Sequence, residues 1–325
     1  MRTHIRRFKL SDTFIEQYKD REVPWGPLGY VTFKRTYARR LSEFDEEATG
    51  TEEWYQTCRR VIEGMFEMQK QHVYKLGLEW NDNKAQKTAK NAFDRLFNLK
   101  WTPPGRGLWM MGTEFVNKRT AAGLFNCAFR STRELNTKGG YLFSWMMDAL
   151  MLGIGVGFDT LGAGTLEIKK PEYTNENYVI EDSREGWVES VQILLNGFLF
   201  GAKVPNFDYT AIRPYGAAIK GFGGTSSGAG PLIELHESLT ELYSGRVGQQ
   251  ITSVDIVDTE NLIGRCVVAG NVRRSAALAL GNHEDFEYLQ MKNDSEKLAH
   301  HRWGSNNSFH AIVGQDYTWH AEQSQ

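Results

Sequence analysis

One cysteine in this chain has surroundings in which a thiol could do redox chemistry. Cys127 follows Asn126 inside the apolar stretch Leu-Phe-Asn-Cys-Ala-Phe at residues 124–129. An accessible thiol can act as a nucleophile or as one half of a redox pair. A free cysteine between two phenylalanines is, however, more often a packing residue of the core. The pattern alone therefore favours packing and leaves redox chemistry as the alternative.

Two glycine-rich segments later in the chain could hold a nucleotide. Residues 153–158 predict a glycine-rich turn, but Phe158 stands where a dinucleotide-binding fingerprint needs its third glycine. Residues 221–230 lack the Gly-Lys-Ser/Thr ending of a phosphate-binding P-loop. They lead into a helix expected to start at Pro231, whose free N–H groups could bind an anion. A tight turn that packs a helix against a strand explains these glycines equally well.

A third segment, residues 270–276, carries two adjacent arginines. Arg273 and Arg274 are bordered by glycine and small polar residues, and planar guanidinium groups can bind phosphate or bases. Paired arginines are usually solvated surface charges. That interpretation is harder to sustain here, because residues 262–269 directly before them look like a buried segment.

Composition restricts the class of protein. The chain has 325 residues, 41% hydrophobic and 24% charged, as in an ordinary globular protein of one large or two average domains. A formal net charge of −2 argues against a general nucleic-acid binder, and no apolar run approaches the length of a membrane span. With no signal core after the basic start, we expect a cytoplasmic protein without a membrane or nucleic-acid partner.

The other candidate ligands are best explained by packing. Three cysteines are too few and too scattered for a disulfide scaffold or a zinc site. Cys58 lies on the apolar stripe of a predicted helix, and Cys266 lies within the buried segment. His300 and His301 are adjacent and cannot ligate from one helix face, so a surface or helix-end role is expected.

The pattern of residues divides the chain into two regions. Residues 1–50 look irregular, with an extended piece at 30–33. Helical periodicity covers 52–76, with Thr51 as its expected N-cap, and 83–99, before a Pro-Pro-Gly breaker. We therefore predict a mostly helical cap over residues 1–104. In residues 105–325 predicted helices at 141–151, 186–197 and 231–243 alternate with extended segments at 206–212 and 307–313, which indicates an α/β layer or barrel with parallel strands.

Several motifs resemble one known family in the same order. The chain is similar to the adenosylcobalamin-dependent ribonucleoside-triphosphate reductases (class II ribonucleotide reductases) from about residue 25 to 310. The motifs that carry this resemblance are residues 30–39, Asn126-Cys127, 155–158, 182–187, 212–217, 221–225, 267–276, 300–303 and 305–308.

The resemblance implies a fold and a set of roles. It implies an N-terminal helical cap followed by the first half of a ten-stranded α/β barrel. Cys127 matches one member of the family's redox cysteine pair, which reduces the 2′-carbon of the substrate ribonucleoside triphosphate. The matching substrate-binding positions are Asn126, Arg106 and Gly155, with Gly155 expected in a turn beneath Asn126. The matching positions for a deoxynucleoside triphosphate effector are Asp182, Arg184, Gly270, Asn271, Arg273 and Arg274.

Other parts of the family's machinery find no match in this sequence. In the family, adenosylcobalamin supplies a radical, a further cysteine becomes a thiyl, another pairs with the counterpart of Cys127, and a C-terminal pair relays electrons from a thioredoxin-type reductant. Cys266, the last cysteine, matches none of these positions. We therefore expect an N-terminal reductase part that is inactive without a complementary C-terminal chain. The alternatives are a nucleotide-binding regulatory module without catalysis and a reading frame with no stable product.

Overall fold

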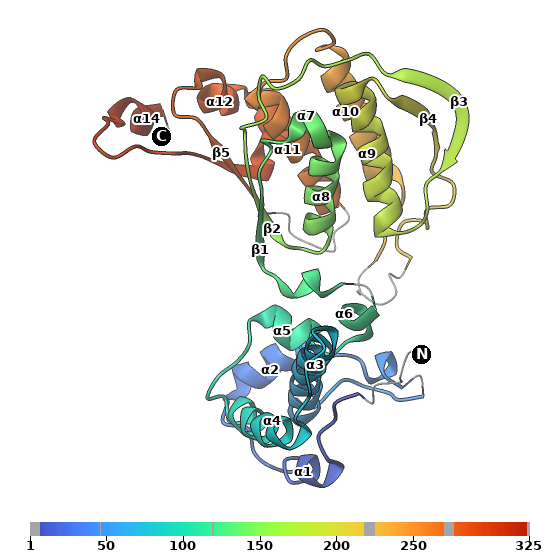
Figure 1. The fold of residues 1–325 in the computed structure, drawn as a ribbon, viewed down its shortest axis with the longest axis vertical. Helices are drawn as coiled ribbons and strands as arrows, with labels where there is room; N and C mark the ends of the chain where they lie inside the picture. Colours follow the sequence, from blue (N-terminus) through green and yellow to red (C-terminus); the bar gives the residue numbers. More distant parts are fainter. Residues whose placement is uncertain (1–6, 46, 119, 218–224, 270–275, 324–325) are drawn as a thin grey trace. The chain divides into compact units, whose positions relative to one another are not determined.

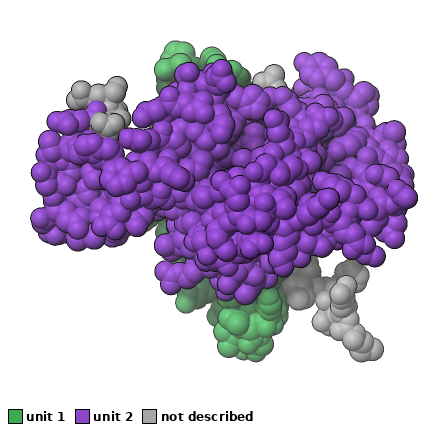
Figure 2. Space-filling model, turned by 90° about the horizontal axis from the view of Figure 1, so that it is seen from above, with its two compact units in different colours: residues 1–125 green, residues 126–325 purple. Residues whose placement is uncertain are grey.

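The computed structural model describes residues 7–45, 47–118, 120–217, 225–269 and 276–323. Contacts divide the chain into two compact units, residues 1–125 and 126–325 (Figure 2). The ranges 1–104 and 105–325 stay predictions of domain limits, while the contacts place the division after Phe125. Among the described residues no helix is both long and apolar enough to cross a membrane.

The first unit is built from helices around an aromatic core. Phe93 and Phe97 of one helix pack against Tyr18, with ring centroids 4.8 and 5.0 Å apart. The helices predicted at 52–76 and 83–99 are confirmed. The elements are α1 (Asp12–Glu16), α2 (Pro27–Thr36), η1 (Leu41–Glu43), α3 (Trp54–Lys75), α4 (Asp82–Phe97), α5 (Gly105–Met110), α6 (Glu114–Lys118) and η2 (Ala121–Leu124) (Figure 1).

Two local predictions in this unit are wrong. Residues 30–33 are not extended but form the middle of α2, and the first fifty residues also hold α1 and η1. Pro27 suits the first turn of α2, and Phe33 packs on Trp54 with ring centroids 5.3 Å apart, which overrides the strand preference of this run. Thr51 does not cap α3. Glu53 does so in a capping box with Gln56.

A buried ion pair fastens α3 to α5. Arg60 donates from Nε to Glu52 at 2.7 Å, and its remaining donors reach the carbonyls of Leu108 at 2.9 Å and Met111 at 2.6 Å. Buried charges are tolerated when paired and hydrogen-bonded in this way. The pair therefore fixes α5, the helix that carries Arg106.

The second unit is an α/β structure with parallel strands, as expected. Strands β1 (Cys127–Arg130), β2 (Gly155–Asp159), β5 (Ala277–Gly281) and β6 (Ser305–Phe309) form one parallel sheet in the order β1-β2-β5-β6. Strands β3 (Glu172–Val179) and β4 (Lys203–Asp208) form a separate parallel pair. The helices are α7 (Leu135–Lys138), α8 (Gly140–Met151), α9 (Arg184–Phe200), α10 (Gly230–Ser244), α11 (Ser253–Ala269), α12 (Phe286–Gln290), α13 (Ser295–His300) and α14 (Thr318–Gln323), with η3 (Met291–Asn293) and η4 (Arg302–Gly304) (Figure 1).

The two faces of the four-stranded sheet differ. Val156, Phe158, Ala277 and Ala279 are buried on the face against which α8 and α11 pack (Figure 1). Side chains alternate along a strand, so the neighbouring residues point to the other face. On that face the described residues leave Phe129 53% and Leu278 38% exposed. We call this face, which carries Cys127, Phe129, Gly155, Gly157 and Leu278, the open face.

Helix predictions in the second unit are confirmed and the extended ones need correction. Segments 141–151, 186–197 and 231–243 lie in α8, α9 and α10. Residues 262–269 form the last part of helix α11, where Leu262, Ile263, Gly264 and Cys266 are buried and Ala269 is exposed. The turn predicted at 153–158 is wrong, because only Gly153 has a left-handed φ of 69° and Gly155 begins β2. Strand β4 begins and ends before the predicted 206–212. It stops at Asp208, whose carboxylate accepts from Thr210 N–H at 2.9 Å and turns the chain. The strand predicted at 307–313 ends at Phe309.

Candidate functional site

Cys127 lies at the amino end of β1, at the edge of the open face. It is exposed, as are Asn126 before it and Phe129 two residues later. Cys127 and Gly155 are register partners, and Gly155 N–H donates to the Asn126 carbonyl at 2.8 Å. The thiol is therefore accessible, against the packing interpretation that its apolar neighbours favoured.

Gly155 leaves space beside this thiol. It belongs to β2 and not to the turn expected beneath Asn126. Its φ is not left-handed, and a Cβ added there would find nothing nearer than the Asn126 carbonyl oxygen at 3.6 Å and Ala276 at 3.7 Å. Neither the backbone nor the packing requires glycine here. The missing side chain instead keeps the open face free between Cys127 and Ala276.

Ala276, the last residue of the segment 270–276, lies at the same end of the sheet. Ala276 precedes β5, and its carbonyl accepts from Val156 N–H at 2.9 Å. The effector positions predicted at Gly270, Asn271, Arg273 and Arg274 lie outside the described residues. Ala276 therefore lies beside Gly155, and β2 separates it from Cys127.

The other two cysteines are inert packing residues, as predicted. Cys58 is fully buried in α3, and Cys266 is 4% exposed in α11. Burial raises the pKa of Cys58 well above its ordinary value and that of Cys266 to about 12. Helix α11 packs on the covered face of the sheet, whereas Cys127 belongs to the open face. Cys266 is thus on the wrong side to form a disulfide with Cys127.

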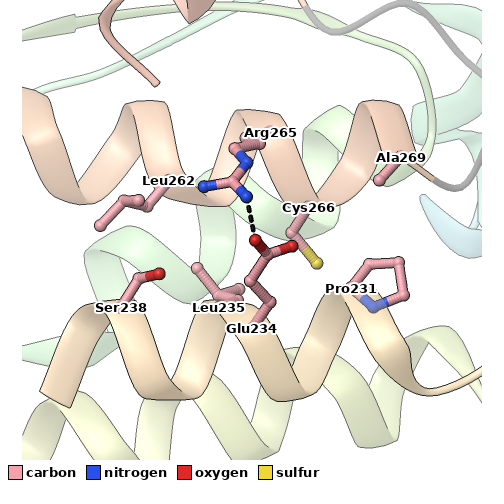
Figure 3. Close-up of a pocket in the computed structure, with 8 residues that line it drawn as sticks. All are labelled: Pro231, Glu234, Leu235, Ser238, Leu262, Arg265, Cys266 and Ala269. Carbon is pink, nitrogen blue, oxygen red and sulfur yellow. Dashed lines mark hydrogen bonds and ion pairs between the residues drawn. The ribbon is translucent and has the colours of Figure 1, made fainter. Parts of the chain in front are cut away.

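Cys266 lines a shallow groove between α10 and α11. Pro231, Leu235, Leu262 and Cys266 line it, and Arg265 of α11 forms an ion pair with Glu234 of α10 between the two helices (Figure 3). Arg265 also contacts His300 at the end of α13. His300 therefore has the helix-end position that the sequence predicts, and the groove is a seam between packed helices.

Arg106, the predicted substrate contact in the first unit, hydrogen-bonds within that unit. Its guanidinium donates to the carbonyl of Gly123 in η2 at 3.2 Å, and burial lowers its pKa. Element η2 is followed two residues later by Asn126. Arg106 thus holds the segment that leads to the cysteine, and its contact with a substrate stays a prediction.

The described effector positions lie at the start of α9. Ser183 caps this helix by accepting from Gly186 N–H at 3.0 Å. Asp182 pairs with Arg213, whose Nε lies 2.7 and 3.0 Å from the two carboxylate oxygens. Arg213 was not among the predicted site residues. The Ile-Arg-Pro-Tyr-Gly motif that contains it was the one sequence signal that could have found it.

Arg184, the second described effector position, is already engaged. It forms ion pairs with Asp148 of α8 and with Glu185, the latter at 2.7 Å. Burial raises the pKa of Asp148 despite this arginine. Arg184 therefore joins α8 to α9, and its contact with a nucleotide stays a prediction. Among the residues that the structure describes, no three His, Cys, Asp or Glu side chains are grouped as a metal site would need.

Comparison with known proteins gives consistent matches along the chain. Residues 10–113 match the ribonucleotide reductase alpha domain, and residues 160–243 match the insertion domain of B12-dependent ribonucleotide reductase. The chain is 41% identical to a probable adenosylcobalamin-dependent ribonucleoside-triphosphate reductase of Dictyostelium discoideum, over 97% of this chain and 44% of the relative. It is 44% identical to the corresponding reductase of Euglena gracilis, over 96% and 43%.

A solved structure extends the match to the fold. The crystal structure of a B12-dependent (class II) ribonucleotide reductase aligns with a TM-score of 0.77 and 32% identity, covering 93% of this chain and 48% of that one. The chain thus spans somewhat less than half the length of the curated relatives that it matches. On this evidence the chain belongs to the B12-dependent, class II ribonucleotide reductase family, of whose longer members it corresponds to the N-terminal portion.

Proposed function

We propose that this chain supplies the N-terminal part of a reductase that converts ribonucleoside triphosphates into 2′-deoxyribonucleoside triphosphates. The observation that supports this most is the position of Cys127. It is the exposed thiol of the three, it lies at the amino edge of an open sheet face, and Gly155 leaves space beside it. A ribose could approach the sulfur there, between Asn126 and the segment that enters β5.

The proposed role of Cys127 is that of one reducing thiol. Replacing the 2′-hydroxyl by hydrogen requires two electrons. Two thiols supply them by forming one disulfide, while the hydroxyl leaves as water with a thiol proton. Cys58 and Cys266 are both buried, so the second thiol must come from outside the residues of this chain. A thioredoxin-type dithiol would then reduce the disulfide and complete the cycle.

The described residues on the open face do not enclose a site for adenosylcobalamin. The group supplies radical chemistry, which requires water to be excluded from the reacting atoms. Phe129 and Leu278 on the open face remain 53% and 38% exposed. We therefore assign the cofactor mainly to the part of the enzyme that this chain does not span, and derive no step through it.

A deoxynucleoside triphosphate effector is proposed for the second described site. The first turn of the 17-residue helix α9 places the positive end of the helix dipole where an anion could bind. Asp182 can accept from a sugar hydroxyl. Arg213, which pairs with Asp182, and Arg184, two residues further along the chain, are the arginines beside it. The remaining contacts are expected from Gly270, Asn271, Arg273 and Arg274.

The complementary partner is expected to continue the sheet. Parallel sheets are normally covered on both faces, and within the described residues β6 hydrogen-bonds to β5 alone. An exposed strand edge and an uncovered face both favour association with a further α/β segment. A cytoplasmic location belongs to the same proposal, since three free cysteines suit a reducing compartment.

A complementation assay tests the proposal. The purified chain is mixed with the C-terminal segment of the Euglena relative, adenosylcobalamin, a ribonucleoside triphosphate and a dithiol. We expect deoxynucleotide formation from the mixture, none from this chain alone, and none from the mixture with Cys127→Ser. Turnover by the chain alone, or by the Cys127→Ser mixture, would contradict the proposal. The alternative of a regulatory module predicts nucleotide binding without turnover in any mixture, and it gives no reason for an exposed Cys127.

A further inference from the structure

A buried histidine joins three elements of the second unit. His236 of α10 is 5% exposed and hydrogen-bonds through both ring nitrogens. Its Nε2 lies 3.2 Å from the Ser190 hydroxyl of α9, and its Nδ1 lies 2.7 Å from the Tyr209 hydroxyl, just after β4. Ser190 in turn donates to the carbonyl of Trp187 at 2.8 Å. We call the chain Tyr209–His236–Ser190 the relay.

The direction of each hydrogen bond in the relay follows from its last member. Ser190 has one hydroxyl hydrogen, and the Trp187 carbonyl can only accept it. His236 Nε2–H must therefore donate to Ser190, which leaves Nδ1 as the acceptor for the Tyr209 hydroxyl. This is one tautomer of a neutral imidazole, and burial accordingly lowers the pKa of His236 to about 3. Each member of the relay is thus satisfied in a single arrangement.

The relay fixes two segments that meet at the Asp182–Arg213 pair. Ser190 lies two turns into α9, about 10 Å from the N-terminal end that carries Asp182. Tyr209 opens the turn that ends next to Arg213, and its carbonyl accepts from Ile212 N–H at 3.1 Å. His236 therefore sets the spacing between α9 and the 209–213 turn without contacting either Asp182 or Arg213 in any described interaction.

From this geometry we propose that His236 is a positioning residue for nucleotide binding at the Asp182–Arg213 pair. The inference rests on the proposed effector function of that pair. The ligand class is a deoxynucleoside triphosphate, whose sugar and phosphates must be met by the α9 terminus and Arg213 at a fixed separation. Loss of the relay would let these two groups drift apart while the rest of the fold persists.

The test compares variants that cut the relay with one that weakens the same helix elsewhere. His236→Gln keeps a donor toward Ser190 and removes the acceptor for Tyr209, whereas Tyr209→Phe removes the other partner. Ser144→Ala is the matched control, because Ser144 donates to Gln192 of α9 at 2.8 Å and lies outside the relay. Affinities of the full chain for dATP, dGTP, dCTP and dTTP are measured by calorimetry, and melting temperatures by circular dichroism.

We expect His236→Gln to weaken binding about tenfold, as the loss of about one hydrogen bond would. Tyr209→Phe should do the same, and the double variant should bind no worse than either single variant, because both cut one relay. Ser144→Ala should change affinity less than about twofold at a similar loss of melting temperature. Affinities of His236→Gln equal to wild type, or an equal loss in Ser144→Ala, would overturn the proposal.

A readout without ligand separates this inference from the proposed effector function. Amide exchange at Ile212 should accelerate in His236→Gln and stay unchanged in Ser144→Ala, since only the first frees the 209–213 turn. If wild type binds none of the four nucleotides, the effector function fails. If amide exchange at Ile212 is unchanged in His236→Gln, the positioning role fails, whether or not wild type binds a nucleotide.

Discussion

His236 should make the second unit lose stability in mild acid. Burial lowers its pKa from 6.5 to about 3 in the folded chain. Because the unfolded chain binds the proton more readily, stability is complete above pH 6.5 and is lost as the pH falls from 6.5 toward 3. Each pH unit in that window costs about 1.4 kcal/mol, so the loss between pH 7 and pH 4.5 is about 3 kcal/mol. The two hydrogen-bond partners of the ring do not titrate there: Ser190 is neutral, and the pKa of Tyr209 is raised to about 12 by burial.

Urea unfolding of wild type and His236→Gln from pH 7.5 to 4.5 isolates this effect. Glutamine does not titrate, and the carboxylates common to both proteins cancel in the difference between them. The variant should be the less stable protein at pH 7.5, and the gap should narrow by about 3 kcal/mol at pH 4.5. A gap that stays constant over this range would show that His236 is not a buried neutral base, and the tautomer assigned to it would then be wrong.

Three further outcomes follow from the site and its supports. Cys127 should be the one thiol alkylated by iodoacetamide within minutes at pH 8, which peptide mass spectrometry checks; fast labelling of either buried thiol would contradict the burial described here. Asp258→Asn should destabilise by about 3 kcal/mol or more, because it removes the countercharge of Arg302, whose Nε and Nη2 lie 2.7 Å from the two carboxylate oxygens. Thermal unfolding tests this, and D258N/R302M should recover part of the loss. Gly155→Ala should change the free energy of unfolding by less than about 1 kcal/mol. It should nevertheless reduce any protection of Cys127 against alkylation by a bound nucleotide. A large destabilisation would show that the fold itself needs this glycine.

The fold could be predicted where apolar residues repeat with a single helical or strand period. Helices α8, α9 and α10 follow from apolar residues at helical spacing, and the alternation of strands and helices indicated the parallel sheet. The prediction failed at residues 30–33 and 153–158, where local composition pointed the other way. In α2 the burial of Phe33 decides the conformation, and in β2 hydrogen bonds to strands on both sides do. Both are contacts with distant residues, which no local window contains.

The candidate site shows the same division. Its motifs named Asn126, Cys127, Gly155 and Asp182 because the resemblance extends along the sequence. Contacts between residues far apart in the sequence could not be predicted. Arg213 contacts Asp182 across 31 positions, and His236 contacts Ser190 across 46 positions. Neither pair has a spacing that a periodicity or a motif would report. Their discovery needed the topology that brings α9, α10 and the turn after β4 together.

The exposure of Cys127 is the point at which local composition misleads most. Phenylalanines on both sides made its surroundings look like a core, yet Phe125 is 64% and Phe129 53% exposed in the structure. Large apolar side chains on an uncovered parallel sheet are unfavourable in water, so a surface that covers them is expected in the working protein. The same covering surface would exclude water from Cys127 and bring the second thiol to it. Under the proposed function, the apolar neighbours of Cys127 would pack against the covering partner segment, and the core-like composition around this cysteine would then be explained.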